Sequence, residues 1–337
     1  MMEPAPLYRV DDQSVLLGVY RRVLWDRLTR VTPAWIHPNV LTIASQLCAV
    51  AAAVLSSFAA SRGIPALFAW SALSLLMCLT LDNIDGAHAR RTNQCSALGE
   101  LLDHGLDGIA SASTLLVTCN VLHLEGPLMV VLCGLGALAF GVVFWEQLRT
   151  GVLRLPKVSP TEGITILAIW ELLSFVFDDP PWLRFAPRAL TAGTVAAAIF
   201  VVTHAFAIVV PLVRARRHVR VHAREVAPFF VLSAAQLVFV VPAGSRATSS
   251  WIAAVTVGVI AANVTCHMIQ LRQRKTVTAI IPAPLWALIV PAALALASPR
   301  YAPVWGAASL GIALASYAAS ITRGVSGVLR PSGAVRA

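Results

Sequence analysis

Long apolar runs separated by short polar connections make up most of the chain. A run of about 20 apolar residues is long enough to cross a lipid bilayer as a helix. Such runs lie at about 40–60, 65–81, 105–122, 126–145, 163–177, 188–213, 227–243, 250–271, 277–297 and 302–322, and the run at 163–177 is the shortest. The pattern predicts an all-α integral membrane protein with about ten transmembrane helices.

The stretch at 11–32, before the first run, mixes apolar and basic positions at helical spacing. Its apolar positions are Val15, Leu16, Val19, Tyr20, Val23 and Leu24, with arginines between and after them. A helix with one apolar and one basic face lies in the plane of the membrane surface. We therefore expect an N-terminal interfacial amphipathic helix.

Composition agrees with a membrane protein. Only 12% of the residues are charged and 58% are hydrophobic, whereas soluble domains have about 25% charged residues. We see no soluble domain, and we interpret residues 1–337 as a single membrane domain. Six cysteines show no paired spacing, which argues against a disulfide framework or a zinc site.

The basic residues predict how the helices cross the membrane. Short cytoplasmic loops retain Lys and Arg, and the chain has 26 of them. With ten spans and a cytoplasmic N-terminus, the basic residues on the other side are Arg62, Arg184, Arg188, Arg246 and Arg300. The net charge of +10 is thus mainly a topology feature. The one dense basic run, at 214–224, lacks interleaved aromatic residues, so no nucleic-acid partner is expected.

Four aspartates lie at the ends of two apolar runs. Asp82 and Asp85 are spaced i, i+3, and Asp103 and Asp107 are spaced i, i+4, so each pair projects from one face of its own helix. Four carboxylates that converge at a partly dry site repel one another unless divalent cations neutralise them. The sequence therefore predicts a metal site at the membrane boundary.

The aspartates belong to a longer pattern. From Asp82 the chain reads D-x-x-D-G-x-x-A-R, then eight residues, then G-x-x-x-D-x-x-x-D. The small and basic positions of this pattern are Gly86, Ala89, Arg90 and Gly99. The pattern resembles the signature of the CDP-alcohol phosphotransferase family, the class-I CDP-alcohol phosphatidyltransferases. The sequence GELLDHGLD, with His104 directly after the third aspartate, resembles the choline/ethanolaminephosphotransferase branch, as do the stretches at 8–42 and 145–163.

The resemblance implies an activity. It implies an enzyme that transfers phosphoethanolamine or phosphocholine from CDP-ethanolamine or CDP-choline to diacylglycerol, with release of CMP. Two Mg²⁺ or Mn²⁺ ions on the four aspartates would be the cofactors, and His104 the general base. Asn39, Gly86, Ala89, Arg90 and Gly99 would bind the CDP-alcohol. Two alternatives stay open at this point: Asn39 caps the helix after Pro38, and the glycines serve close helix packing.

The resemblance also implies an organisation and a location. The catalytic core would span about 33–215, with additional C-terminal spans at 227–322, and the family forms homodimers. The active site would face the cytoplasm, in the endoplasmic reticulum or Golgi membrane of a eukaryote or the inner membrane of a bacterium. A phosphatidyltransferase that uses CDP-diacylglycerol and a small polar alcohol is one alternative. A metal-dependent membrane transporter is another, because intramembrane carboxylates also mark transport pathways.

Overall fold

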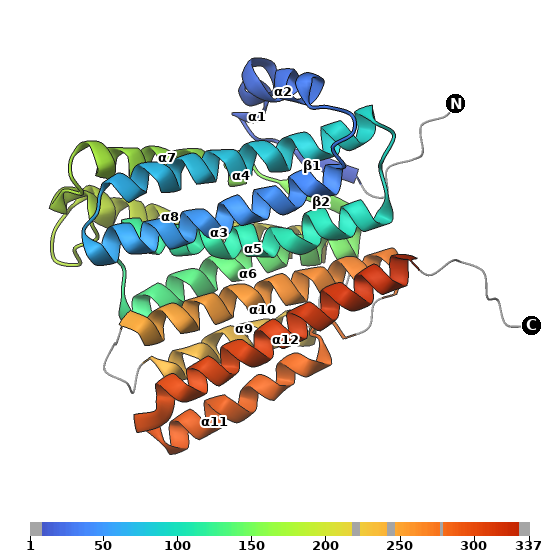
Figure 1. The fold of residues 1–337 in the computed structure, drawn as a ribbon. Helices are drawn as coiled ribbons and strands as arrows, with labels where there is room; N and C mark the ends of the chain where they lie inside the picture. The colour runs from blue at the N-terminus through green and yellow to red at the C-terminus, as the bar shows by residue number, and fades with distance from the viewer. Residues whose placement is uncertain (1–8, 218–222, 241–246, 277–278, 330–337) are drawn as a thin grey trace, which may run out of the picture.

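The structure is a computed structural model, and it describes residues 9–217, 223–240, 247–276 and 279–329. In this part of the chain long helices run side by side in a bundle (Figure 1). The long helices are α3 (Pro38–Arg62), α4 (Ala66–Arg91), α5 (Ala97–Val121), α6 (Gly126–Thr150), α7 (Pro160–Val176), α8 (Ala192–Arg216), α10 (Ala247–Gln273) and α12 (Ala302–Leu329). Shorter helical pieces are α1 (Leu17–Tyr20), η1 (Arg21–Trp25), α2 (Asp26–Val31), η2 (Pro181–Leu183), α9 (Ala223–Ala235), η3 (Gln236–Phe239), η4 (Ala283–Leu288), α11 (Ile289–Ala297) and η5 (Pro299–Tyr301).

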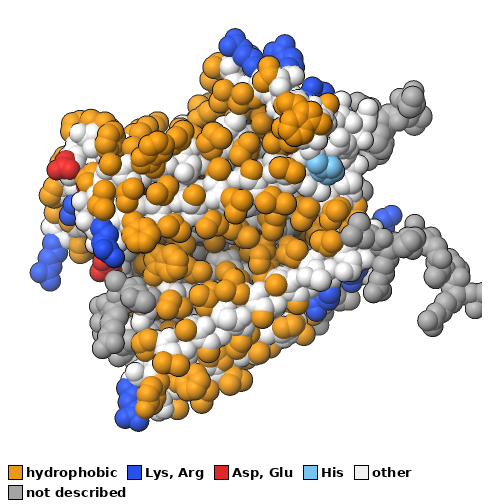
Figure 2. Space-filling view, in the orientation of Figure 1, with side chains coloured by type: hydrophobic (Ala, Val, Ile, Leu, Met, Phe, Trp, Pro, Cys, Tyr) orange, Lys and Arg blue, Asp and Glu red, His pale blue; other side chains and the backbone are white. Residues whose placement is uncertain are grey.

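The predicted all-α membrane fold is confirmed. Among the described residues, six helices are long and apolar enough to cross a membrane, namely α3, α4, α6, α8, α10 and α12. Hydrophobic side chains cover much of the face of the bundle shown in Figure 2. Exposed large apolar side chains of the long helices include Leu47, Trp70 and Phe206. The helix α7 has 17 residues, and α9 and α11 are shorter still. The count of ten spans therefore stays a prediction.

Helix bounds differ from the apolar runs mainly around the aspartate signature. The helix α4 continues to Arg91, beyond the predicted end of its run at 81, and α5 begins at Ala97 instead of 105. Ser96 caps α5 by accepting a hydrogen bond from the Gly99 backbone N–H at 3.0 Å. Polar residues of the signature extend both helices beyond their apolar segments, so hydropathy alone ends α4 too early and starts α5 too late.

Two predicted runs correspond to broken helices. The run at 227–243 contains the end of α9 and η3, and its last residues lie outside the described part of the chain. The run at 277–297 contains η4 and α11, and residues 277–278 also lie outside it. Pro282 precedes η4, and Pro291 lies inside α11. Proline lacks the N–H that a continuous helix requires, which accounts for a broken segment here.

Basic residues lie at both ends of the described bundle, while the alternation over ten spans stays a prediction. The C-terminal end of α10 meets the N-terminal end of α5, where Gln273 Nε2 donates to the Ala97 carbonyl oxygen at 3.3 Å. Arg90 and Arg91 end α4 at this same end of the bundle, whereas Arg62 ends α3 at the other. Arg220, Arg246, Arg330 and Arg336, which the topology prediction also used, lie outside the described residues.

The N-terminal segment lies across one end of the bundle and includes a feature that the sequence did not predict. Residues 17–31 are helical as α1, η1 and α2, with Val15, Val19 and Val23 exposed. Before them, β1 (Arg9–Asp12) pairs in parallel with β2 (Val152–Leu155). The prediction of helix from position 11 was therefore wrong for the first residues, because backbone pairing with the segment after α6 holds them extended.

Glu162 in the first turn of α7 fixes this N-terminal segment. Its Oε1 accepts from Ser14 Oγ at 2.7 Å and from the Leu16 N–H at 2.8 Å. Its Oε2 accepts from the Ser159 N–H and hydroxyl, both at 2.8 Å, which completes a capping box. Burial raises the pKa of Glu162, but hydrogen bonds from Leu16, Ser14 and Ser159 outweigh burial and hold the pKa at about 2.

Glu162→Gln should loosen the N-terminal segment from α7. The amide keeps one acceptor atom and loses the charge, so we expect a loss of roughly 1–2 kcal/mol in the free energy of unfolding at neutral pH. Because the folded pKa is depressed, the charge of Glu162 stabilises the fold above the unfolded pKa and loses this effect as pH falls toward 2. Thermal unfolding from pH 7 to pH 3 measures the difference between the two proteins.

The control is Glu125→Gln, because Glu125 is exposed and its side chain caps no helix. This variant should unfold like the wild type, and its N-terminal segment should resist protease equally well. Equal stability of the Glu162 and Glu125 variants at pH 7 would contradict the assigned role.

Candidate active site

The C-terminal part of α4 and the N-terminal part of α5 bring the four aspartates together. Asp82 and Asp85 come from α4, and Asp103 and Asp107 come from α5. Asp82 lies within electrostatic range of the other three, and Asp85 within range of both aspartates of α5. The carboxylates of two helices therefore face one another and repel, as a site for cations requires.

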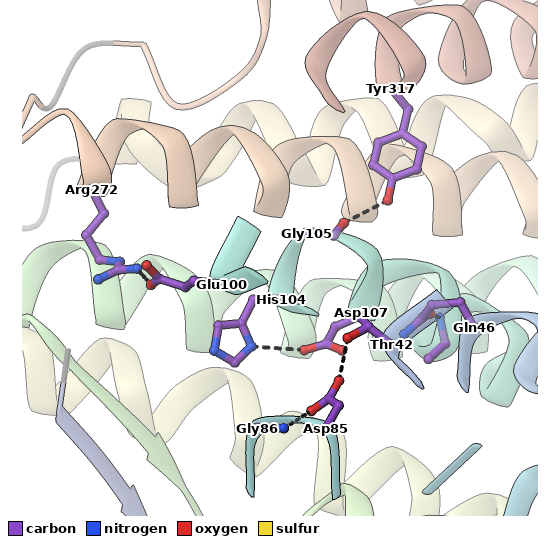
Figure 3. Close-up of polar contacts among 11 residues, drawn as sticks. Thr42, Gln46, Asp85, Gly86, Glu100, His104, Gly105, Asp107, Arg272 and Tyr317 are labelled. Carbon is purple, nitrogen blue, oxygen red and sulfur yellow. Dashed lines mark hydrogen bonds and ion pairs between the residues drawn. The ribbon is translucent and has the colours of Figure 1, made fainter. Parts of the chain in front are cut away.

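Asp85 is held in place on two sides. Its Oδ2 accepts a hydrogen bond from Thr42 Oγ1 of α3 at 2.6 Å, and its Oδ1 accepts one from the Gly86 N–H. Both contacts are drawn in Figure 3. Asp85 is 3% exposed and Thr42 is buried as well. The oxygens of Asp85 are thus oriented by α3 and by its own helix.

On α5, Asp103, His104 and Asp107 form a compact group. One ligand atom from each lies within 4.8 Å of the others. His104 Nδ1 lies 3.2 Å from Asp107 Oδ2 (Figure 3). Carboxylate oxygens are the donors that Mg²⁺ and Mn²⁺ prefer, and opposite ligands of an octahedral Mg²⁺ ion lie about 4 Å apart. The carboxylates of Asp103 and Asp107 are suited to a divalent ion, and Asp82 and Asp85 lie within electrostatic range of both from α4.

His104 lies beside Asp107 and an aromatic side chain. A carboxylate next to Nδ1 favours the tautomer with the proton on Nδ1, which makes Nε2 the basic nitrogen. The His104 and Phe144 rings are 6.0 Å apart in an edge-to-face arrangement, and Phe140 packs on Phe144. Asp107 and Phe144 therefore restrict the orientation of the imidazole.

The expected CDP-alcohol-binding residues lie around this group. A Cβ on Gly86 would come within 3.5 Å of the Arg90 guanidinium, so Arg90 bends back along α4 over the glycine. Arg90 is also within electrostatic range of Asp103. A Cβ on Gly99 would lie 3.5 Å from Asn39 Oδ1, so the start of α3 meets the start of α5. Ala89 lies one position before Arg90 on α4 and is partly buried.

One alternative for Asn39 is excluded. The residue that caps α3 is His37, whose Nδ1 accepts the Asn39 backbone N–H at 3.2 Å. Asn39 itself lies inside the first turn, and its side-chain oxygen faces Gly99. The capping role therefore falls to a residue that the sequence interpretation did not single out.

Other polar residues near the signature have structural partners. His88 is fully buried, and its Nε2 contacts the Ile36 carbonyl oxygen at 2.8 Å. Glu146, at 1% exposure, is paired with Arg154 at 3.3 Å and Arg214 at 3.5 Å. These contacts join separate segments of the chain, so we assign His88 and Glu146 structural roles. The four aspartates and His104 stay the candidate functional groups at this end of the bundle.

The sequence analysis missed two polar residues close to the site, Gln46 and Tyr317. Gln46 of α3 is buried, and its Oε1 accepts from the Ala110 N–H of α5 at 3.1 Å. Its position one helical turn after Thr42 is a usable signal, because both are polar positions in an otherwise apolar run. Tyr317 of α12 donates to the Gly105 carbonyl oxygen at 2.7 Å, and nothing in the local sequence indicates that contact.

The fold and the site define a multi-pass membrane protein with four clustered aspartates, suited to divalent ions, at one end of its helix bundle. Residues 35–209 match the family described as CDP-alcohol phosphatidyltransferase. The match includes all four aspartates, His104 and the other signature residues. The chain belongs to this family, as the resemblance of the signature predicted.

Several similar proteins are named cholinephosphotransferase or choline/ethanolaminephosphotransferase. The chain is 32% identical over 193 residues to cholinephosphotransferase 1 of Gallus gallus, which covers 54% of this chain and 58% of that protein. It is 29% identical over 177 residues to choline/ethanolaminephosphotransferase 1 of Saccharomyces cerevisiae, which covers 50% of this chain and 45% of that protein. The chain thus spans about half the length of the curated relatives it matches.

Proposed function

We propose that the protein transfers phosphoethanolamine or phosphocholine from the matching CDP-alcohol to diacylglycerol. The observation that carries the proposal is the group of Asp103, His104 and Asp107, with ligand atoms within 4.8 Å of one another, facing Asp82 and Asp85 across the α4–α5 junction. The names of the similar proteins support the choice of headgroups. The four aspartates would hold Mg²⁺ or Mn²⁺, two ions as the signature implies.

The proposed reaction assigns roles to the residues of the site. His104 Nε2 removes the proton from the acceptor hydroxyl, whose oxygen attacks the β-phosphorus of the CDP-alcohol. A new P–O bond forms, the bond from that phosphorus to the bridging oxygen breaks, and CMP leaves with its electron pair. Asp107 orients His104 and stabilises the imidazolium that forms. When bound, the divalent ions would neutralise the diphosphate and the charge on the leaving group.

The surroundings of the site suit a polar donor and an apolar acceptor. Asn39, Gly86, Ala89, Arg90 and Gly99 lie at the polar end of the bundle, where the positive charge of Arg90 would attract a diphosphate. Apolar helix surfaces continue from there along the bundle (Figure 2). We propose that the site faces the cytoplasm, in the endoplasmic reticulum or Golgi membrane of a eukaryote or the inner membrane of a bacterium, and that the protein acts as a homodimer.

A donor comparison tests the proposal. Purified protein in detergent, supplied with diacylglycerol and Mn²⁺, should release CMP from CDP-ethanolamine or CDP-choline. CDP-diacylglycerol with serine, inositol or glycerol phosphate should give no CMP. CMP release only from CDP-diacylglycerol would establish the phosphatidyltransferase alternative, and release from none of these donors would leave a transport role.

A further inference from the structure

The helix that carries Asp103, His104 and Asp107 has a second face, which packs against α10 and α12. A Cβ on Gly108 would lie 2.3 Å from Ala262 Cα of α10, so the two backbones touch there. A Cβ on Gly105 would lie 3.6 Å from Cys266 Sγ. Small residues allow such close helix contact in membranes. The position of α5 is therefore set from behind by α10.

Two polar contacts join the same helices. Tyr317 of α12, at 8% exposure, donates its hydroxyl to the Gly105 carbonyl oxygen at 2.7 Å. Arg272 of α10 forms an ion pair with Glu100 in the first turn of α5. Figure 3 shows Tyr317 reaching α5 from the side opposite to His104 and Asp107, with the Glu100 pair near the start of the helix. These contacts hold α5 on both sides of Asp103, and Gly105 lies two positions before Asp107.

The helices α10 and α12 are in turn fixed to each other by buried polar side chains. Asn263 Nδ2 donates to Ser316 Oγ at 2.6 Å, and Ser320 Oγ donates to Asn263 Oδ1 at 2.7 Å. Gln270 Nε2 donates to the Ser320 carbonyl oxygen at 2.8 Å. In a low-dielectric interior, satisfied networks of this kind hold one arrangement. Tyr317 thus projects from a rigid pair of helices.

We infer that α10 and α12 act as a positioning scaffold for the metal-binding turn of α5, with Tyr317 as a positioning residue. The carbonyl of Gly105 already accepts the helical hydrogen bond from the residue four positions later, and the Tyr317 hydroxyl is a second donor to it. Holding this carbonyl fixes the rotation of α5 and hence the directions of Asp103 and Asp107. Ligands must be placed to within about 0.5 Å for full function.

The inference goes beyond the family match, which ends at residue 209, before α10 and α12. It rests on the proposed metal site. It assigns a role to the C-terminal helices, for which the sequence indicates none. The test compares Tyr317→Phe with wild type and with Tyr301→Phe. Tyr301 is 45% exposed and is the last residue of η5, directly before α12, so Tyr301→Phe removes a tyrosine hydroxyl that makes no hydrogen bond to α5 among the described residues.

The first readout is Mn²⁺ affinity, measured on purified protein by electron paramagnetic resonance without any CDP-alcohol. The Tyr317→Phe variant lacks one hydrogen bond to α5. We therefore expect its Mn²⁺ affinity to be about fivefold lower than that of the wild type, and its kcat to fall by a similar factor. Tyr301→Phe should match wild type in both. Unchanged Mn²⁺ affinity in Tyr317→Phe, with only a lower melting temperature, would overturn the inference and make the contact purely structural.

The same measurements separate failure of the inference from failure of the proposed function. Wild-type protein that binds Mn²⁺ but releases no CMP from any CDP-alcohol would reject the function and leave the comparison of Mn²⁺ affinities valid. Wild-type protein that binds no Mn²⁺ would reject the metal site and the positioning role together.

Discussion

Asp107→Asn should lower the rate of CMP release by about a thousandfold or more, since a metal ligand that stabilises the transition state contributes several kcal/mol. The substitution removes one of the carboxylates of the site and the charge beside His104. Asparagine has nearly the same shape, so the fold should be retained. The rate is measured with saturating Mn²⁺ and CDP-alcohol on purified protein.

The matching control is Asp178→Asn, because Asp178 is exposed in the connection between α7 and α8. It should keep wild-type activity. The same loss should follow from substitution of Asp82, Asp85 or Asp103, and removal of metal with EDTA should abolish activity until Mn²⁺ is restored. Full turnover in the presence of the chelator would contradict the metal assignment.

His104→Gln should slow the chemical step by roughly a hundredfold to ten-thousandfold, the range for a positioned general base. Glutamine retains a hydrogen-bonding group next to Asp107 but cannot take the acceptor proton. The apparent affinity for the CDP-alcohol should change little, because Arg90 and the backbone near Gly86 do not depend on the imidazole. Single-turnover rates at saturating donor separate the chemical step from binding.

His204→Ala serves as the control, because the polar and ring contacts of His204 among the described residues, with Phe200 and Thr203, all lie within α8. Wild-type rates in His104→Gln, with Mn²⁺ binding intact, would remove His104 from the mechanism. That result would favour an aspartate as the base.

The sequence predicted that the four aspartates come together because their arrangement depends on local spacing, whereas their role as metal ligands stays a proposal. The spacing of Asp82, Asp85, Asp103 and Asp107 places them on facing helices, and two helices joined by a short turn bring the pairs together. Hydropathy located the helices but not their ends, since α4 and α5 continue through polar residues. The strand pair of β1 and β2 escaped prediction because it joins segments more than a hundred residues apart.

The support behind the site depends on distant contacts that no local pattern encodes. Tyr317 reaches Gly105 across 212 positions of sequence, and Ser14 reaches Glu162 across 148. Neither a tyrosine in an apolar run nor a serine in the N-terminal segment indicates a distant partner by its local sequence. Their partners follow from how the helices pack, which depends on small residues such as Gly108 and Ala262 meeting at one face.

The most direct measurement follows the phosphorus atoms of the donor. Purified protein is given diacylglycerol, Mn²⁺ and CDP-choline or CDP-ethanolamine that is radiolabelled at the β-phosphorus. The proposed reaction predicts that the label appears in a phospholipid and that unlabelled CMP is released in equal amount. Label found in free phosphocholine or phosphoethanolamine, or retained entirely in the donor, would contradict it.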